Sequence, residues 1–197
     1  MKWEILDHKT LYHGFFRLDQ YRLRYARFAG GSNTVTREIF ERGDAVAVLP
    51  YDPVRDEIVL VEQFRPGAVR GGDNPWLLEL IAGMTDEGGT AEQTAHREAW
   101  EEAECVVTDI FPIFRYLTSP GGSTEAITFY AGRTDTSGLG GVHGLHAEHE
   151  DIKVHVFTVE QALNLLNTGK IVNAVTIIGL QWLALNRDSL RRRWTGA

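Results

Sequence analysis

Residues 76–105 read as a strand, a glycine-rich turn and an acidic helix in direct succession, and this order restricts the fold more than any other part of the chain. The apolar segment "WLLELIAGM", over residues 76–84, predicts a short strand that ends at Gly83. The polar and glycine residues of "TDEGG" then predict a tight loop. Because Thr90 is a suitable N-cap, we expect a helix over residues 91–103.

The expected helix carries carboxylates at spacings that oppose helix formation. Glu98 and Glu102 are one turn apart on one face, and Glu101 is three residues from Glu98. Like charges at this spacing destabilise a helix by roughly 0.2–0.5 kcal/mol per pair. Either this face is solvated beside Arg97, or a positive species binds to it. Magnesium prefers carboxylates and water and often links a protein to substrate phosphates, so the face could hold Mg²⁺ together with the carbonyl of Ala82.

The rest of the chain alternates expected strands with two late helices. Residues 10–42 alternate apolar and polar side chains, which predicts two or three antiparallel strands with a turn at "AGGSN". Residues 135–151 have no apolar periodicity, which is typical of a lid, a binding loop or disorder, and the tail 191–197 is expected to fray. The mixture predicts an α+β sandwich, with a mixed sheet between helices. The other expected strands are 45–51, 57–64, 110–119, 126–134 and 152–158, and the expected helices are 159–169 and 173–190.

Composition limits the cellular compartment and the classes of binding partner that we expect. The chain is 43% hydrophobic, which fits a globular protein with a sizeable core, and its net charge of −7 makes it a poor nucleic-acid binder. Cys105 is the single cysteine, so no intrachain disulfide is possible and a reducing, cytoplasmic compartment fits. Residues 1–10 lack the apolar run of a signal peptide. No segment approaches the roughly 18 apolar residues of a membrane span, so no membrane partner is expected.

The segment from Gly83 to Cys105 closely resembles the signature of the Nudix hydrolases. That signature begins with a glycine, has a glutamate six residues later, and ends in Arg-Glu-apolar-x-Glu-Glu-x-Gly-apolar. The resemblance implies the Nudix α/β/α sandwich as the fold class. The residues that match at the required offsets are Gly83, Arg97, Glu98, Ala99, Glu101, Glu102 and Cys105.

Two positions depart from the signature. Gly89 stands where the first glutamate is expected, and in the family that glutamate helps to hold the loop and the helix through the arginine, so we expect Arg97 to be held less firmly. Glu104 stands where the signature has its last glycine, which usually closes the helix in a left-handed conformation. Either Glu104 adopts that conformation at a cost of about 1 kcal/mol, or the helix end is rearranged.

The resemblance covers most of the chain and is greatest to the bacterial ADP-ribose pyrophosphatase branch of the family. Segments such as "REIFERG", "EIVLVEQFR" and "SPGGSTE" carry it, and Pro120 holds the branch's proline about fifteen residues beyond the signature. It implies Mg²⁺-dependent hydrolysis of ADP-ribose to AMP and ribose 5-phosphate. Two alternatives stay open: a nucleotide-sugar hydrolase acting on a compound such as GDP-mannose, and a non-catalytic Nudix module that binds ADP-ribose.

The resemblance also implies roles for acidic residues. Glu98 and Glu102 would be metal ligands together with the carbonyl of Ala82, and two or more Mg²⁺ ions, or Mn²⁺, would bind there. The segment "HAEHED" matches the family's mobile acidic loop, whose alternative interpretation is a solvated polar loop. In it Glu148 would be the catalytic base. The further candidate metal ligands are Glu150 and, with less support, Glu101.

The implied substrate-binding residues come from several segments. Guanidinium groups suit phosphate and ribose oxygens, and aromatic rings suit adenine. In this branch residues 1–42 serve in dimerisation and complete the partner's site, so we expect a homodimer with the Nudix domain over 43–197. Simple packing is the alternative for the phenylalanines, an ordinary strand surface is the alternative for Arg37 and Arg42, and core or dimer packing is expected of Trp76, Trp100 and Trp182. The candidates are Phe15, Phe16, Arg37 and Glu38 from the partner subunit, with Arg42, Arg65, Met84, Ser119, Pro120, Gly121 and Glu125.

Overall fold

The computed structural model describes residues 1–72, 74–85 and 88–196, with Glu148 described by its main chain alone. Contacts divide the chain into two compact units. Unit 1 comprises residues 1–45 and 115–127, and unit 2 comprises residues 46–114 and 128–197. Each unit is described by itself below.

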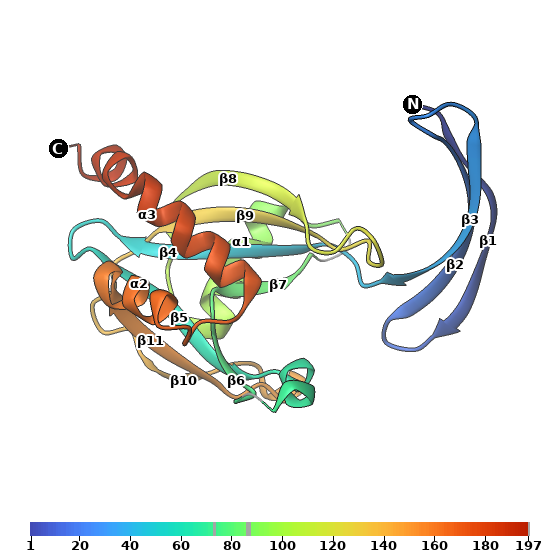
Figure 1. The fold of residues 1–197 in the computed structure, drawn as a ribbon. Coiled ribbons are helices and arrows are strands. Elements are labelled where there is room, and N and C mark those ends of the chain that lie inside the picture. The colour runs from blue at the N-terminus through green and yellow to red at the C-terminus, as the bar shows by residue number, and fades with distance from the viewer. Residues whose placement is uncertain (73, 86–87, 197) are drawn as a thin grey trace. The chain divides into compact units, whose positions relative to one another are not determined.

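Unit 1 is built on a three-stranded antiparallel sheet of order β1-β2-β3 (Figure 1). Its strands are β1 (Trp3–His13), β2 (Arg17–Ala26) and β3 (Ser32–Glu41). The expected antiparallel strands are thus confirmed, although the first begins at Trp3 rather than near residue 10. Buried Asp19 joins β1 to β2, because its carboxylate bonds to His8, Thr10 and Arg17 at 2.8–2.9 Å.

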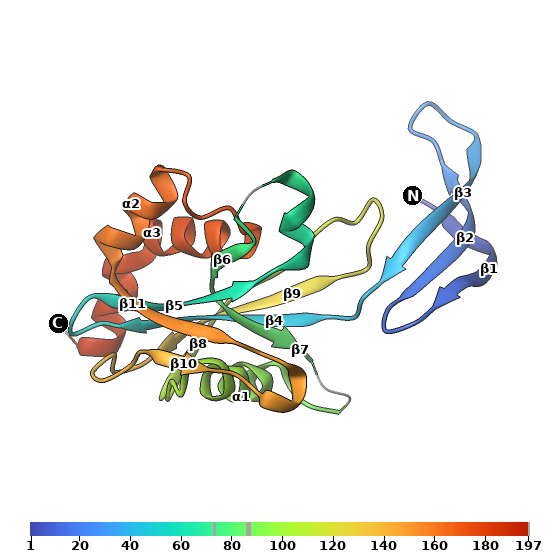
Figure 2. The same cartoon turned by 90° about the horizontal axis from the view of Figure 1, so that it is seen from below.

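The other sheet has eight strands in the described part of the chain, with the order β10-β11-β5-β4-β9-β8 and two short strands that pair on it, β6 with β5 and β7 with β4 (Figure 2). The single strand expected over 76–84 is divided at Leu80, whose amide donates to Thr176 Oγ1 at 2.9 Å instead of to a strand. The strands are β4 (Ala45–Asp52), β5 (Glu57–Phe64), β6 (Trp76–Glu79), β7 (Ile81–Met84), β8 (Asp109–Leu117), β9 (Ala126–Arg133), β10 (Gly141–His143) and β11 (Ile152–Thr158).

Helices cover both faces of this sheet, which confirms the α/β/α sandwich. Helix α1 (Ala91–Ala103) lies on one face, and α2 (Val159–Asn167) and α3 (Ala174–Thr195) lie on the other (Figure 2). Thr90 is the N-cap of α1 as predicted, because its side chain accepts from the amide of Gln93 and the Gln93 side chain accepts from the Thr90 amide. The two short 3₁₀ helices are η1 (Pro66–Gly71) and η2 (His146–Glu148).

Alternate residues of β4 and β5 build the core beneath α1. Small residues on α1 let the helix approach the sheet closely, and the packing positions the face that carries the glutamates. The main members of this cluster are Val46, Val48, Val59, Val61, Ala95, Ala99, Ala103 and Cys105.

Two segments are more ordered than the sequence indicated. The segment 135–151 contains the short strand β10, which pairs with β11 immediately after it. The tail does not fray at residue 191, since α3 continues to Thr195. Trp194 holds it in place, being 5% exposed and donating from Nε1 to Asp109 Oδ2 at 2.9 Å. No helix among the described residues is long and apolar enough to cross a membrane.

Candidate active site

The acidic face of α1 is buried rather than solvated. The side chain of Glu98 is 13% exposed, and Glu102 is 3% exposed. Burial, together with the neighbouring charges of Glu98 and Glu150, raises the pKa of Glu102 to about 8 against the attraction of Arg65. Burial likewise raises the pKa of Glu98 to about 7. The helix therefore turns two carboxylates toward the protein interior with an excess of negative charge around them.

Arg97 offsets part of this charge from the same helix. Its guanidinium lies 2.9 Å from Glu98 Oε1 and 2.7 Å from Glu101 Oε2, and it donates to the carbonyl of Met84 at 3.4 Å. Although Gly89 provides no carboxylate to hold it, Arg97 thus connects the helix to the strand end through other partners.

The strand end before the helix fits closely around the two glutamates. A Cβ atom added to Gly83 would lie 1.8 Å from Glu98 Oε1, so only glycine leaves room for that carboxylate. The amide of Ala82 donates to Glu102 Oε2 at 3.3 Å. Glycine at the head of the signature therefore has a steric cause, which is the close approach of Glu98 to the main chain.

The helix end adopts the left-handed form that the signature predicts for its glycine. Glu104 has φ 46° and ψ 29°. The amide of Glu104 donates to the carbonyl of Trp100 at 2.8 Å, which is the bond of the αL motif of helix closure, and the amide of Cys105 donates to the carbonyl of Ala99 at 2.9 Å. The first of our two alternatives for Glu104 is therefore confirmed.

The loop that carries Glu148 and Glu150 approaches the same region. Glu150 Oε2 accepts from the amide of Leu145 at 3.0 Å, and the charge of Glu150 raises the pKa of both Glu98 and Glu102. Glu148 lies at the end of η2, and its side chain is outside the described part of the structure.

Side chains in the described residues do not form a ready-made group of three metal ligands. The carboxylates of Glu98 and Glu101 are instead directed to Arg97. Their chemistry nevertheless fits a hard cation such as Mg²⁺, which takes oxygen ligands and is satisfied by a few carboxylates plus water. A zinc site is not supported, since His143 uses Nε2 to bond the carbonyl of Gly140 at 2.7 Å.

Arg65, whose charge acts on Glu102, is held by Glu79, an acid that the sequence pattern did not identify. Arg65 Nε lies 2.8 Å from Glu79 Oε2, and Asn173 donates to the other oxygen of Glu79 at 2.8 Å. Glu79 is 3% exposed. Its place as a lone acid in the apolar segment "WLLELIAGM" was a signal that could have identified it.

Unit 1 brings together several of the expected substrate-binding residues. Arg42 pairs with the buried Glu125 and stands 6.0 Å from the ring centroid of Phe16. Phe16 contacts Phe15 and Phe40 edge to face, at 4.7 and 5.1 Å. Aromatic packing is therefore real for Phe16, whereas Phe15 is 88% exposed.

The remaining candidates lie at the surface of their units. In unit 1, Arg37 donates to the carbonyl of its neighbour Thr36, and Glu38 is exposed. Three further candidates of unit 1 lie in an exposed turn, which a hydrogen bond from the Gly122 amide to the Ser119 carbonyl closes. In unit 2, Met84 is 42% exposed. Trp76 and Trp100 are more than half exposed, so neither is a core residue. The residues in the turn are Ser119, Pro120 and Gly121.

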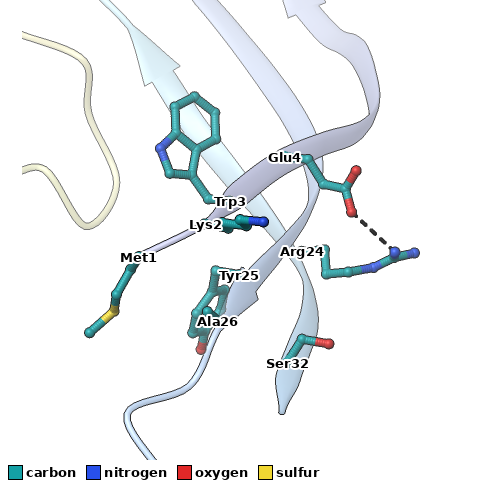
Figure 3. A pocket seen from close by; sticks show the side chains of 8 residues that line it. All are labelled: Met1, Lys2, Trp3, Glu4, Arg24, Tyr25, Ala26 and Ser32. Atoms are coloured by element: carbon teal, nitrogen blue, oxygen red, sulfur yellow. Dashed lines mark ion pairs between the residues drawn. The ribbon is translucent and has the colours of Figure 1, made fainter. Parts of the chain in front are cut away.

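A cavity of about 460 Å³ lies at one end of the β1–β3 sheet (Figure 3). The residues that line it are distant in sequence from the glutamates of α1. Trp3 and Tyr25 line it, and Glu4 pairs with Arg24 beside it at 3.1 Å. Both members of that pair are about half exposed, so it carries little electrostatic weight. None of the candidate catalytic residues lines this cavity, and we assign it no chemistry.

The short strand β7, which contains Gly83, and the helix α1 with its buried glutamates together define the class of the protein. The chain belongs to the NUDIX domain family, whose model matches residues 41–176. It is 49% identical to the ADP-ribose pyrophosphatase of Escherichia coli strain K12 over 192 residues, which cover 97% of this chain and 92% of that protein.

Further relatives support the same placement. The ADP-ribose pyrophosphatase of Haemophilus influenzae is 47% identical over 97% of this chain and 90% of its own. The GDP-mannose pyrophosphatase of Pectobacterium atrosepticum is 34% identical over 90% of this chain and 92% of its own. A solved structure described as an ADP compounds hydrolase matches with a TM-score of 0.69 at 20% identity, over 93% of this chain and 95% of that one, and shows the common fold.

Proposed function

We propose that this chain hydrolyses the pyrophosphate of ADP-ribose to AMP and ribose 5-phosphate in a reaction that needs Mg²⁺. The observation that carries the proposal is the burial of Glu98 and Glu102 on one face of α1, with raised pKa values that Arg97 and Arg65 offset only in part. The relatives named for ADP-ribose are 47–49% identical, against 34% for one named for GDP-mannose, which favours the former substrate.

The residues fit a divalent cation by their chemistry and by the space made for them. The lack of a side chain at Gly83 leaves the space that the Glu98 carboxylate occupies. The Ala82 amide donates to the Glu102 carboxylate and holds it in place. We assign these two glutamates, the carbonyl of Ala82, Glu150 and, less directly, Glu101 as the groups that would hold two or more Mg²⁺ ions. Bound Mg²⁺ supplies charge neutralisation of the pyrophosphate and activation of water.

The protein's own groups supply the remaining steps. Glu148, at the end of η2, would accept the proton of the attacking water as the loop closes. Attack at the adenosyl phosphorus then releases AMP. Arg65 is fixed by Glu79 and would hold a phosphate oxygen, since a guanidinium keeps donors free when one edge is paired. Met84 would pack against the substrate.

Unit 1 would provide the adenine and terminal-ribose contacts, within a homodimer in which residues 1–42 serve the partner's site and 43–197 form the Nudix domain. Exposed aromatic side chains support this, with Trp3 on β1 71% exposed and Phe15, in the connection between β1 and β2, 88% exposed. Cys105, buried and unpaired, fits a cytoplasmic setting. Sedimentation at micromolar concentration tests the assembly, and a fully active monomer would contradict it. The proposed contacts are Phe15, Phe16, Arg37 and Glu38 from the partner, with Arg42, Ser119, Pro120, Gly121 and Glu125.

The activity is tested by measuring phosphate release in a coupled phosphatase assay with ADP-ribose and with GDP-mannose, each with and without Mg²⁺. We expect Mg²⁺-dependent turnover that is greater with ADP-ribose. Greater turnover of GDP-mannose would favour the nucleotide-sugar alternative. Binding of ADP-ribose without turnover of either compound would favour a non-catalytic module.

The base is tested with Glu148→Gln, which keeps the size of the side chain but cannot accept the proton. Turnover should fall by roughly 10²–10⁴-fold, with ADP-ribose affinity nearly intact. Glu92→Gln, at an exposed glutamate of α1, is the matched control and should leave turnover unchanged. If Glu148→Gln keeps more than about a tenth of the activity, the assignment of the base is wrong.

A further inference from the structure

Gln63 is a buried polar side chain whose amide nitrogen has no partner in the described structure. The residue is 8% exposed, and its Nε2 atom is buried without a hydrogen-bond acceptor among the described residues. A buried donor without an acceptor costs free energy that an apolar side chain of the same shape would not. Such a donor calls for an explanation by a ligand.

The position of Gln63 on β5 turns its side chain to the side of the sheet that carries the glutamates. Side chains alternate along a strand, and Arg65 is still extended at φ −119° and ψ 105°, so Val61, Gln63 and Arg65 share one face. Val61 packs in the core cluster with Ala95 and Ala99 of α1. Gln63 therefore lies between that core and Arg65.

Other groups at this end of β5 belong to the candidate active site. Arg65 lowers the pKa of Glu102 by its charge, which places it near that carboxylate. On the other side, the pairs of Val61 with Val154 and of Glu62 with Lys153 bring the start of β11 beside Gln63. The chain segment just before that start contains Glu150.

We propose that Gln63 binds substrate by donating a hydrogen bond from Nε2 to an oxygen of the pyrophosphate, beside Arg65. The proposal rests on the function proposed above and adds a residue that the signature does not contain. A neutral donor suits this place. A second positively charged side chain beside Arg65 would pair with Glu102 and compete with the metal for that carboxylate. In a site closed to water, one such donor contributes more than it would at the surface.

The test compares Gln63→Met, which keeps most of the volume without the amide, with the matched control Gln181→Met at an exposed position on α3. Calorimetry with the α,β-methylene analogue of ADP-ribose, in the presence of Mg²⁺, gives affinity without turnover. We expect the Kd of Gln63→Met to rise roughly 10- to 100-fold, as for a lost bond to a charged group. The Tm of its ligand-free form should be unchanged or up to about 4 °C higher. The control should match the wild type in both.

Two results would overturn the proposal. One is an affinity within twofold of the wild type. The other is weakened binding together with a Tm more than about 4 °C lower, which would make Gln63 a support of the sheet. If the wild type itself does not bind the analogue, the proposed function fails, and inorganic pyrophosphate with Mg²⁺ then becomes the probe for Gln63.

Discussion

Asp52 and Glu102 are both buried carboxylates of unit 2, and the protein surrounds them in opposite ways. Burial alone would raise the pKa of Asp52, but donors around it lower the pKa to about 2. They are the amides of Val54, Arg55 and Thr136, the Arg55 guanidinium and the Thr136 hydroxyl, at 2.8–3.1 Å. Among the described residues, Glu102 has the Ala82 amide at 3.3 Å, and its pKa is raised to about 8.

We interpret this difference as the difference between a structural carboxylate and a proposed metal ligand. Asp52 fastens the turn between β4 and β5 to residue 136, and its charge is fully used inside the protein. Glu102 lies beside Glu98 and Glu150, so its charge is opposed rather than used. A cation bound from solution would offset the repulsion between these carboxylates. Metal binding would then be coupled to the stability of α1.

The largest expected effect comes from removing the opposed charge. Glu102→Gln should lower turnover of ADP-ribose by roughly 10³-fold or more, since several kcal/mol of charge stabilisation are lost. It should weaken Mg²⁺ binding in parallel and should not destabilise the metal-free protein at pH 8. Steady-state kinetics and calorimetry with Mg²⁺ measure the two. Unchanged Mg²⁺ affinity would remove Glu102 from the metal site.

Asp52→Asn should show the reverse pattern. The amide nitrogen of asparagine would face N–H donors, so we expect a loss of about 2–3 kcal/mol of stability. For a chain of this size that lowers the Tm by roughly 4–12 °C. Turnover and Mg²⁺ affinity should stay within about twofold below the melting range. A fall in Mg²⁺ affinity as large as that of Glu102→Gln would erase the distinction between the two carboxylates.

The two regions should also respond oppositely to pH. The pKa of Glu98 and Glu102 is raised from 4.5 to about 7 and 8, so the folded metal-free protein holds more protons than the unfolded chain in this range. Their contribution to stability is therefore present at low pH and lost as pH rises from about 5 to 8. Asp52, with its lowered pKa, loses its contribution only as pH falls below about 3.8 toward 2.

The measurement is the Tm of metal-free wild type minus that of Glu102→Gln across pH 5 to 9. We expect this difference to fall by several degrees with rising pH. A difference that stays flat or rises would show that Glu102 ionises normally in the folded protein.

The smallest effect is expected at Glu104, which ends the acidic helix and is strained in its backbone rather than in its charge. The side chain is 65% exposed, and φ is 46°. Glu104→Gly should stabilise the protein by about 1 kcal/mol, or roughly 2–4 °C in Tm, without changing Mg²⁺ affinity. A lower Tm would mean that residue 104 is helical in solution, because glycine inside a helix costs about 1 kcal/mol.

Sequence patterns predicted the elements whose signals are local. Thr90 marked the start of α1, and the strands expected over 45–51 and 57–64 correspond to β4 and β5. Long-range contacts decided what the patterns missed. The strand over 76–84 divides because Thr176, distant in sequence, bonds Leu80, and the C-terminal helix persists because Trp194 reaches Asp109.

The candidate site shows the same limit. Motif spacing identified Glu98 and Glu102 and the left-handed residue 104, because each depends on neighbours within one helix. It did not identify Glu79 as the partner of Arg65, or Gln63, because these depend on pairing between β5, β6 and β11. The contrast with Asp52 also needed the structure, because Thr136 supplies two of the donors to Asp52 from another part of the chain.

If the buried glutamates of α1 are metal ligands, Mg²⁺ displaces their protons when it binds, so proton release on Mg²⁺ binding tests this assignment most directly. Calorimetry of the metal-free wild type at pH 7, in two buffers of different ionisation enthalpy, gives the number of protons released. The account predicts roughly one proton per protein at pH 7, close to none at pH 9, and a clear reduction in Glu102→Gln but not in Asp52→Asn. Mg²⁺ binding that releases no protons at pH 7, or equal release from Glu102→Gln, would contradict it.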